Sequence, residues 1–356
     1  MAKLTLASLS SRLFSGNYPY VTARVRAKKP KLLPKEQYQR LATMSPPEIA
    51  RSLQEGTYRK EIDELAQRYT GARLVEMATR LNLARTYTEV RGFARGEVET
   101  VVTLILQRYD VYNVKTILRG KFANVPPEEV QDQLVPAGAL SADDLAGLLR
   151  LGSMEEVVER LQATPYGDIL KESLARGVQS LTDLENALDK RYYAQLLHAV
   201  EPGNEPNRAF LKWVRFEIDA LNLKTALRLR ADRIEELGDL HVPGGSETPE
   251  ERVKRWLRAS PDELQSDVAS LPFGKGALAE KLRGFVERGE LSGVVAALDK
   301  QLILSAQSFS HRYPLSVLPV VDYVLRKKVE VDNLRVLALG KAAGLPEATL
   351  KELLIV

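Results

Sequence analysis

The residue types that carry most enzyme chemistry are sparse in this chain of 356 residues. It contains no cysteine, which excludes disulfides, thiolate ligands and cysteine nucleophiles and fits a reducing cytoplasmic setting. Its three histidines have neither a second histidine nor a carboxylate at the i, i+4 spacing of a helical metal site. We therefore expect no metal and no cofactor. The histidines are His198, His241 and His311.

The sequence also lacks the motifs typical of phosphate cleavage and of hydrolysis by a serine nucleophile. The segment Gly274-Lys275-Gly276 lacks the four-residue spacer and the Ser or Thr of a P-loop, so it indicates a turn between helices. No Gly-x-Ser-x-Gly nucleophile turn occurs. Adjacent carboxylates such as Glu128 and Glu129 stand where a helix is expected to begin, and negative charge there favours the helix dipole. The sequence predicts a protein that is not an enzyme.

Positive charge is concentrated near the amino terminus. Residues 1–60 hold twelve Lys and Arg against three Glu, although the net charge of the whole chain is only +4. The segment from Arg24 to Lys31 could bind phosphate groups of nucleic acid or lipid, and a solvated basic arm would show the same pattern. Residues 1–16, which carry several Ser and no acidic residue, are also compatible with an organellar transit peptide. No apolar run reaches the ~20 residues of a membrane helix, so we expect no membrane crossing.

Three capping boxes recur along the chain, 108 and 107 residues apart, and are the main evidence for its helices and for an internal repeat. In each box a Ser-x-x-Glu sequence is followed directly by an apolar residue, which predicts that a helix begins there. An apolar residue eight positions after the serine and an aromatic residue thirteen positions after it recur as well. The boxes begin at Ser45, Ser153 and Ser260, and the aromatic residues are Tyr58, Tyr166 and Phe273.

A second motif, in which an acid is followed by Asn, an apolar residue and a basic residue, recurs at nearly the same period. Apolar residues spaced by three or four positions precede each asparagine and predict long helices that face a core. No sustained alternation of apolar and polar residues, typical of strands, occurs. We expect the polar residues of the motif to form a solvated stripe or to link neighbouring units. The copies are Asp110 with Asn113, Asp219 with Asn222, and Glu330 with Asn333.

These repeats divide the chain into three units. An apolar residue followed by proline opens the next segment each time, at Val135-Pro136, Val242-Pro243 and Leu345-Pro346, with Leu33-Pro34 as the corresponding start near the amino terminus. The chain therefore begins and ends partway through a unit. We predict an all-α fold of three similar helical domains, at 1–119, 120–228 and 229–356, the last including the closing C-terminal helix.

Taken together, the motifs resemble the family of the C subunit of the A/V-type rotary ATP synthase, whose eukaryotic counterpart is the d subunit of the vacuolar ATPase. The resemblance is carried by the capping boxes, by Asp110 to Gly120 with its copy Asp219 to Arg228, and by the opening Tyr18 to Ala27. It covers about Tyr18 to Val356 and weakens the transit-peptide interpretation. The third copy departs from the pattern, with Val336 and Leu339 where the other two have Thr and Arg.

The resemblance implies a funnel of three domains around a pseudo-threefold axis. It implies a non-catalytic part of the central stalk that sits on the cytoplasmic face of the membrane, between the rotor ring of proteolipid subunits and the central shaft. There it would transmit torque for ATP synthesis or ATP-driven ion pumping. It would associate with the membrane through the complex, without insertion, and neither a cofactor nor nucleic acid is expected among its partners.

A partner interface is expected at basic residues of the amino-terminal segment and of the repeated motif. The alternative function is a basic helical protein that binds nucleic acid or a membrane surface through residues 24–35. Salt-sensitive binding to RNA, without association with a membrane complex, would favour that alternative. The expected interface residues are Arg24, Arg26, Lys28, Lys29, Arg119 and Arg228.

Overall fold

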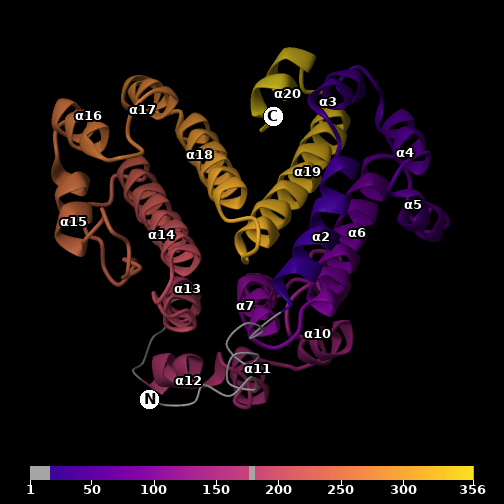
Figure 1. Cartoon of the computed structure of the whole chain (residues 1–356), viewed down its shortest axis with the longest axis horizontal. Coiled ribbons are helices and arrows are strands. Elements are labelled where there is room, and N and C mark those ends of the chain that lie inside the picture. Colours follow the sequence, from indigo (N-terminus) through magenta and orange to yellow (C-terminus); the bar gives the residue numbers. More distant parts are fainter. Residues whose placement is uncertain (1–16, 176–180, 356) are drawn as a thin grey trace, which may run out of the picture. The chain divides into compact units, whose positions relative to one another are not determined.

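The computed structural model describes residues 17–175 and 181–355, which form helices joined by turns and short loops (Figure 1). The suggested transit segment, residues 1–16, lies outside the described residues. Within the described ranges there is no β-strand, which confirms the all-α prediction. The chain divides into two compact units, which we call unit 1 and unit 2. Unit 1 is Met1–Asp110, Asp132–Ala142 and Ser310–Val356, and unit 2 is Val111–Gln131 and Asp143–Phe309.

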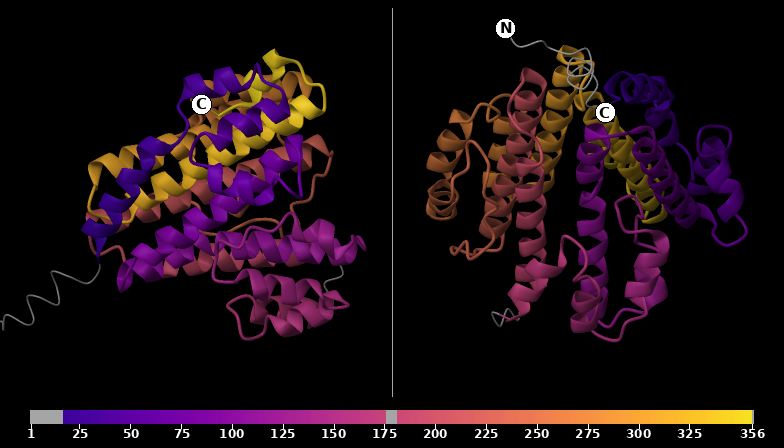
Figure 2. Two further views of the ribbon diagram at one scale, coloured as in Figure 1. Left: turned by 90° about the vertical axis from the view of Figure 1, so that its right-hand side faces the viewer. Right: turned by 60° about the horizontal axis from the view of Figure 1, so that its bottom comes forward.

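Unit 1 is formed by the two ends of the chain. The C-terminal helix α19 packs along α6 and α2 from the amino-terminal part, and both figures show these three helices side by side (Figures 1 and 2). The elements of unit 1 are α2 (Tyr18–Lys28), the 3-10 turn η1 (Lys29–Lys31), α3 (Lys35–Leu41), α4 (Pro46–Gln54), α5 (Arg59–Leu65), α6 (Gly71–Phe93), α7 (Glu97–Leu106), α19 (Leu318–Ala342) and α20 (Glu347–Leu353).

One hydrophobic core joins those two ends. Leu41 and Ile49 from the amino-terminal helices cluster with Leu334, Leu337 and Leu350 from the carboxyl-terminal ones, and all five side chains are fully buried. Burying one such side chain contributes about 1.5–3 kcal/mol, so neither end of the chain completes this core alone.

Unit 2 holds the middle of the chain, which enters it within α8 and leaves it within α18. Its core includes the fully buried Trp256, Leu264 and Leu282, packed with Leu223 and Leu298 of two long helices. The helices are α8 (Arg108–Phe122), α9 (Pro127–Gln131), α10 (Ala142–Leu149), α11 (Met154–Arg160), α12 (Gly167–Ala175), α13 (Leu181–His198), α14 (Glu205–Ala231), α15 (Glu250–Arg258), α16 (Pro261–Ser270), α17 (Ala277–Arg288) and α18 (Leu291–Arg312).

The capping boxes mark helix starts as predicted. Helices α4, α11 and α16 begin directly after the three box serines. The box of α16 is complete, and the Ser260 amide donates to the Glu263 carboxylate at 2.8 Å. The box of α11 is only half formed, because the Glu156 carboxylate accepts from the Gly152 amide at 2.9 Å instead of from Ser153.

The long helices α8, α14 and α19 share one kind of ending. Eleven residues after the motif asparagine, the chain takes a left-handed conformation, and the next amide donates to the carbonyl five residues before it, as in a Schellman motif. The left-handed residues are Asn124 (φ 52°), Arg233 (φ 58°) and Gly344 (φ 75°). The amide bonds are Val125 to Gly120 at 2.9 Å, Ile234 to Leu229 at 2.8 Å and Leu345 to Gly340 at 2.9 Å.

This helix ending shows which apolar-Pro pairs occupy equivalent places in the copies, and it corrects the predicted equivalence. Leu345-Pro346 corresponds to Val125-Pro126, because both pairs directly follow the left-handed residue. Its predicted equivalence with Val135-Pro136 and Val242-Pro243 was wrong. Two dipeptides of the same type lie ten residues apart in the first copy, and residue type alone could not choose between them.

Candidate functional site

The acidic residue of the repeated motif is buried in every copy and binds main-chain amides. Asp110 accepts from the amides of Ala139 at 2.8 Å and Leu140 at 2.9 Å. Asp219 accepts from the Thr248 amide at 2.9 Å and from the Thr248 hydroxyl at 2.7 Å. Each carboxylate therefore holds a loop that follows its own helix, and the hydrogen bonds compensate for the cost of burying a charge.

The asparagine three positions later holds a second backbone segment. The Asn222 side chain donates to the Val242 carbonyl at 2.8 Å and accepts from the Val242 amide at 3.0 Å. Asn333 makes the same pair of bonds to Ile355, at 2.9 and 3.0 Å. Asn113 is 0% exposed. The expectation of a solvated stripe was therefore wrong, because the motif asparagine is buried in every copy.

The third copy replaces aspartate by glutamate, and its longer side chain reaches different partners. Glu330 accepts from the Leu33 amide at 2.6 Å, from the Tyr58 hydroxyl at 2.6 Å and from the Lys327 ammonium at 2.7 Å. Burial lowers the pKa of Lys327, and burial together with Glu330 raises the pKa of Tyr58 well above its usual range. The cluster ties α19 to the amino-terminal segment of unit 1.

The basic residue of the motif pairs with a carboxylate on another long helix in all three copies. Those carboxylates lie on α13, α18 and α6 respectively. Two of the pairs lie within unit 2 and the third within unit 1. The repeated motif is thus a set of structural anchors. The pairs are Lys115 with Asp189 at 2.5 Å, Lys224 with Asp299 at 2.6 Å and Arg335 with Glu76 at 3.4 Å.

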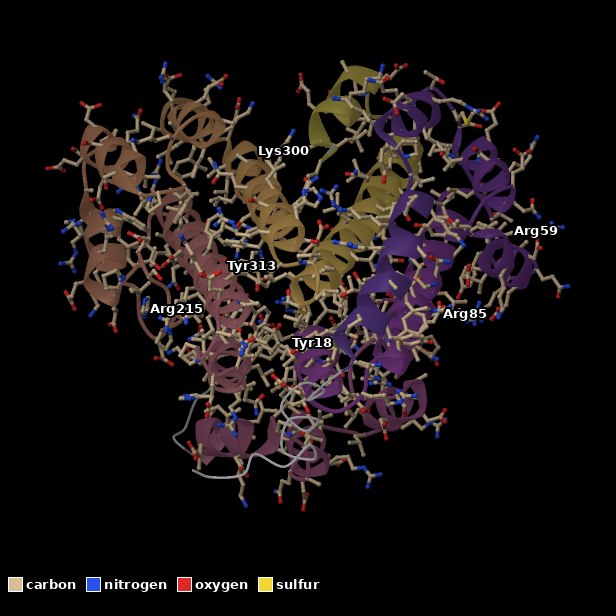
Figure 3. All side chains as sticks on the ribbon, viewed as in Figure 1. Tyr18, Arg59, Arg85, Arg215, Lys300 and Tyr313 are labelled. Atoms are coloured by element: carbon tan, nitrogen blue, oxygen red, sulfur yellow. The ribbon has the colours of Figure 1, made fainter. Side chains whose placement is uncertain are left out.

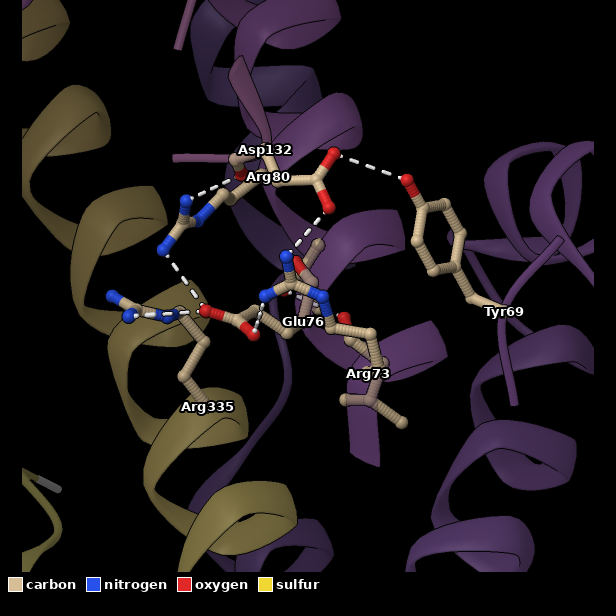
Figure 4. A network of polar contacts seen from close by, with 8 residues as sticks. Tyr69, Arg73, Glu76, Arg80, Asp132 and Arg335 are labelled. Atoms are coloured by element: carbon tan, nitrogen blue, oxygen red, sulfur yellow. Dashed lines mark hydrogen bonds and ion pairs between the residues drawn. The ribbon is translucent and has the colours of Figure 1, made fainter. Parts of the chain in front are cut away.

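Glu76 is the centre of a larger charged network in unit 1 (Figure 4). It contacts Arg73 at 2.7 Å and Arg80 at 2.9 Å in addition to Arg335. Arg73 also pairs with the Asp132 carboxylate at 2.6 Å, and Arg80 donates to the Asp132 carbonyl at 2.7 Å. The network fastens the segment around Asp132, which is remote in sequence, to helix α6.

The predicted basic interface at the amino terminus is largely engaged inside unit 1. Arg24 lies over the Phe93 ring, with its guanidinium 4.5 Å from the ring centre. Lys28 pairs with Glu89 at 2.6 Å, and Lys29 pairs at 2.6 Å with Asp322, which is 1% exposed. These side chains support α2 as well as giving it positive charge.

Arg26, Arg119 and Arg228 are exposed, as is Arg24. Arg26 lies on α2 in unit 1, whereas Arg119 on α8 and Arg228 on α14 belong to unit 2. Arg119 forms two bonds of 2.5 Å to the Glu185 carboxylate. Leu339, which takes the corresponding place in the third copy, is 38% exposed. The position six residues after the motif asparagine thus faces solvent in every copy.

Neither a metal site nor a membrane-spanning helix occurs in the part of the chain that the structure describes. That part contains no group of three or more His, Asp or Glu side chains placed to hold a metal ion. None of its helices has the length and apolar character needed to span a membrane. Gly274-Lys275-Gly276 is a turn ahead of α17, as predicted.

Sequence analysis missed the loops that the motif acids hold. A signal was present in the glycines Gly138 and Gly245, which follow the motif acid by 28 and 26 residues. A Cβ atom at these positions would lie 2.1 Å from Asp110 and 2.2 Å from Asp219. Only glycine lets the backbone approach the carboxylate so closely.

Comparison with known proteins gives one consistent result. A sequence model of the family described as ATP synthase (C/AC39) subunit matches residues 21–353. The C subunit of the A-type ATP synthase of Methanococcoides burtonii is 39% identical over 355 residues, covering 98% of this chain and 97% of the relative. The corresponding C subunits of Archaeoglobus fulgidus and Haloferax volcanii are each 36% identical, over 97% and 95% of this chain and 98% of either relative.

Proposed function

Because this chain belongs to the ATP synthase (C/AC39) subunit family, we propose that it couples the membrane rotor ring to the central shaft of an A/V-type rotary ATP synthase. It is a structural subunit of that complex and not a catalyst by itself. In the proposed role it transmits torque, either for ATP synthesis driven by an ion gradient or for ATP-driven ion pumping. The match along nearly the full length of both this chain and its relatives carries the proposal.

A coupling part must resist bending, and the repeated anchors supply that resistance. Long helices α14 and α19 are each fastened by hydrogen bonds from a buried asparagine to a later segment, and each is paired to another long helix. Packed interiors have low compressibility and transmit strain. A load applied to one helix is therefore passed to its neighbours.

The proposal includes the predicted surroundings of the protein. The chain lies at the cytoplasmic face of the membrane, where the proteolipid ring and the shaft subunits contact it from opposite sides. It consists of three similar helical domains, divided near residues 119 and 228, and each presents the exposed position occupied by Arg119, Arg228 or Leu339.

The test is a pull-down of the tagged full-length chain from detergent-solubilised membranes of its own cells. The expected result is recovery of both the ring proteolipid and the shaft subunits, in amounts comparable to the tagged chain. Recovery of the catalytic part of the complex without these two partners would contradict the coupling position. Recovery of RNA without any ATP synthase component would favour the alternative of a basic nucleic-acid binder.

Charge reversal at Arg26 refines the test. Arg26 is exposed and Arg24 is occupied by Phe93, so Arg26→Glu changes the surface charge of α2 without breaking an internal contact. Reduced recovery of the ring in a salt-dependent manner would show that α2 faces it. Arg228→Glu on α14 is the matched reversal in unit 2.

A further inference from the structure

A pocket in unit 1 is lined by more positive than negative side chains. It has a volume of about 300 Å³, at the lower end of the range for small-ligand sites. Helices α2, α5, α6 and α19 and the turn η1 contribute to its wall, and the side chains of this unit, including Arg85, are drawn in Figure 3. Its charged residues are Lys28, Lys31, Lys60, Arg85, Lys327, Glu61 and Glu89. We call it the Lys60 pocket.

Both carboxylates of the Lys60 pocket already pair with a basic side chain. Glu61 contacts Arg85 at 3.0 Å and accepts from Asn82 at 2.9 Å, and its side chain is 4% exposed. Glu89 pairs with Lys28 at 2.6 Å. Neither carboxylate pairs with Lys31 or Lys60.

Two of the lysines form no ion pair with a described residue. These are Lys31 on η1 and Lys60 on α5, both exposed at the pocket. Behind them Lys327 is 4% exposed and pairs with Glu330 at 2.7 Å. Burial lowers the pKa of Lys327, against the opposing effect of Glu330. The uncompensated positive charge of the pocket is therefore that of Lys31 and Lys60.

We propose that the Lys60 pocket binds a small anion that carries phosphate. Lys28, Arg85 and Lys327 are each paired with a carboxylate, so the excess of positive charge comes from Lys31 and Lys60. A phosphate group carries about −1.5 to −2 near neutral pH, which matches two lysines better than a single carboxylate does. Lysine ammonium groups bind phosphate as point charges, and the hydroxyls of Thr57 and Thr86 line the same pocket. This inference is independent of the proposed coupling role.

The test is calorimetric titration of pyrophosphate into the intact purified chain, with a paired variant and a matched control. The variant K31Q/K60Q removes the two exposed lysines of the pocket. The control K171Q/K212Q removes two exposed lysines of unit 2 and has the same net charge. We expect one site with a Kd below about 1 mM at low salt. Binding should weaken about tenfold or more in K31Q/K60Q and stay unchanged in the control.

Sedimentation with vesicles distinguishes a soluble ligand from a lipid headgroup. The vesicles are phosphatidylcholine with cardiolipin, a lipid that carries two phosphate groups. Sedimentation that is displaced by pyrophosphate and lost in K31Q/K60Q assigns the site to a headgroup, whereas pyrophosphate binding without sedimentation assigns it to a soluble anion. The inference is overturned if neither probe binds, or if K31Q/K60Q binds as well as the unaltered chain. Circular dichroism of K31Q/K60Q verifies that the fold is retained.

Discussion

The Asn333 side chain binds the backbone of Ile355 at both its amide and its carbonyl, 22 residues further along the chain. Asn222 does the same to Val242 after 20 residues. An asparagine inside a helix usually weakens the helix slightly, so its presence at the same place in these copies is explained by the segment that it holds. Substitution of each asparagine compares a buried pair of hydrogen bonds, at Asn222, with a partly exposed pair, at Asn333.

Asn222→Ala is expected to lower the free energy of unfolding by about 3 kcal/mol. Val242 is buried, so the substitution leaves its amide and carbonyl, and the Thr248 hydroxyl, without the Asn222 partner and away from water. Asn333→Ala should cost only about 1 kcal/mol, because Ile355 is half-buried and water can replace the amide. Urea midpoints followed by circular dichroism measure both. Equal losses of unfolding free energy in the two variants would show that burial of the backbone bound by the asparagine does not determine the cost of the substitution.

Arg233→Gly is expected to raise stability by about 0.5–1 kcal/mol. Arg233 is exposed and has a φ of 58°, a conformation that strains any residue with a Cβ atom. Glycine already occupies the equivalent place at position 344, and Gly344→Ala should lower stability by about 1 kcal/mol. Thermal unfolding of the two variants provides the comparison. A loss of stability in Arg233→Gly would mean that the contacts of the arginine side chain stabilise the fold by more than the left-handed backbone conformation destabilises it.

Glu76→Gln is expected to cost about 3 kcal/mol or more. The substitution removes the negative charge shared by Arg73, Arg80 and Arg335, and Arg80 is only 8% exposed, so loss of the charge beside it is costly. Glu99→Gln, at an exposed position of α7, is the control and should change stability by less than about 0.5 kcal/mol. Urea denaturation measures both, and hydrogen exchange around Asp132 should rise only in the Glu76 variant. Unchanged exchange there would show that the network does not hold this segment.

Asp267 should make unit 2 sensitive to acid. Hydrogen bonds from Arg252, Trp256 and Arg255 lower the pKa of its carboxyl to about 2. Because the folded pKa lies below the unfolded value of about 3.9, this stabilisation is present above pH ~4 and is lost as the pH falls through about 2. It amounts to about 1 kcal/mol, since the carboxylate is partly exposed and water screens it.

Asp267→Asn is the variant that checks this pH dependence. The difference in urea midpoint between the unaltered chain and the variant should be largest near neutral pH and should shrink between about pH 4 and pH 2. A difference that stays constant over this range would assign the effect to packing against the indole of Trp256, which donates to the carboxylate at 2.6 Å.

Sequence alone determined the features that depend on neighbours within one or two helical turns. Ser45, Ser153 and Ser260 marked helix starts, because a capping box is satisfied by residues three positions away. The period of these boxes also predicted that the chain ends partway through a unit. Leu41 and Leu334, from opposite ends of the chain, share one core, and the division into three units stays a prediction.

Only the tertiary structure decided what the polar residues of the repeat contact. Asp110 and Asn113 have the spacing of a solvated helix face, and the same spacing serves a buried face whose partners are backbone groups. Every residue has a backbone carbonyl and nearly every residue an amide, so no residue type in the sequence marks the partner. For a related reason Lys29 was predicted to belong to a free basic patch, although Asp322, 293 residues away, neutralises it once α19 packs along α2.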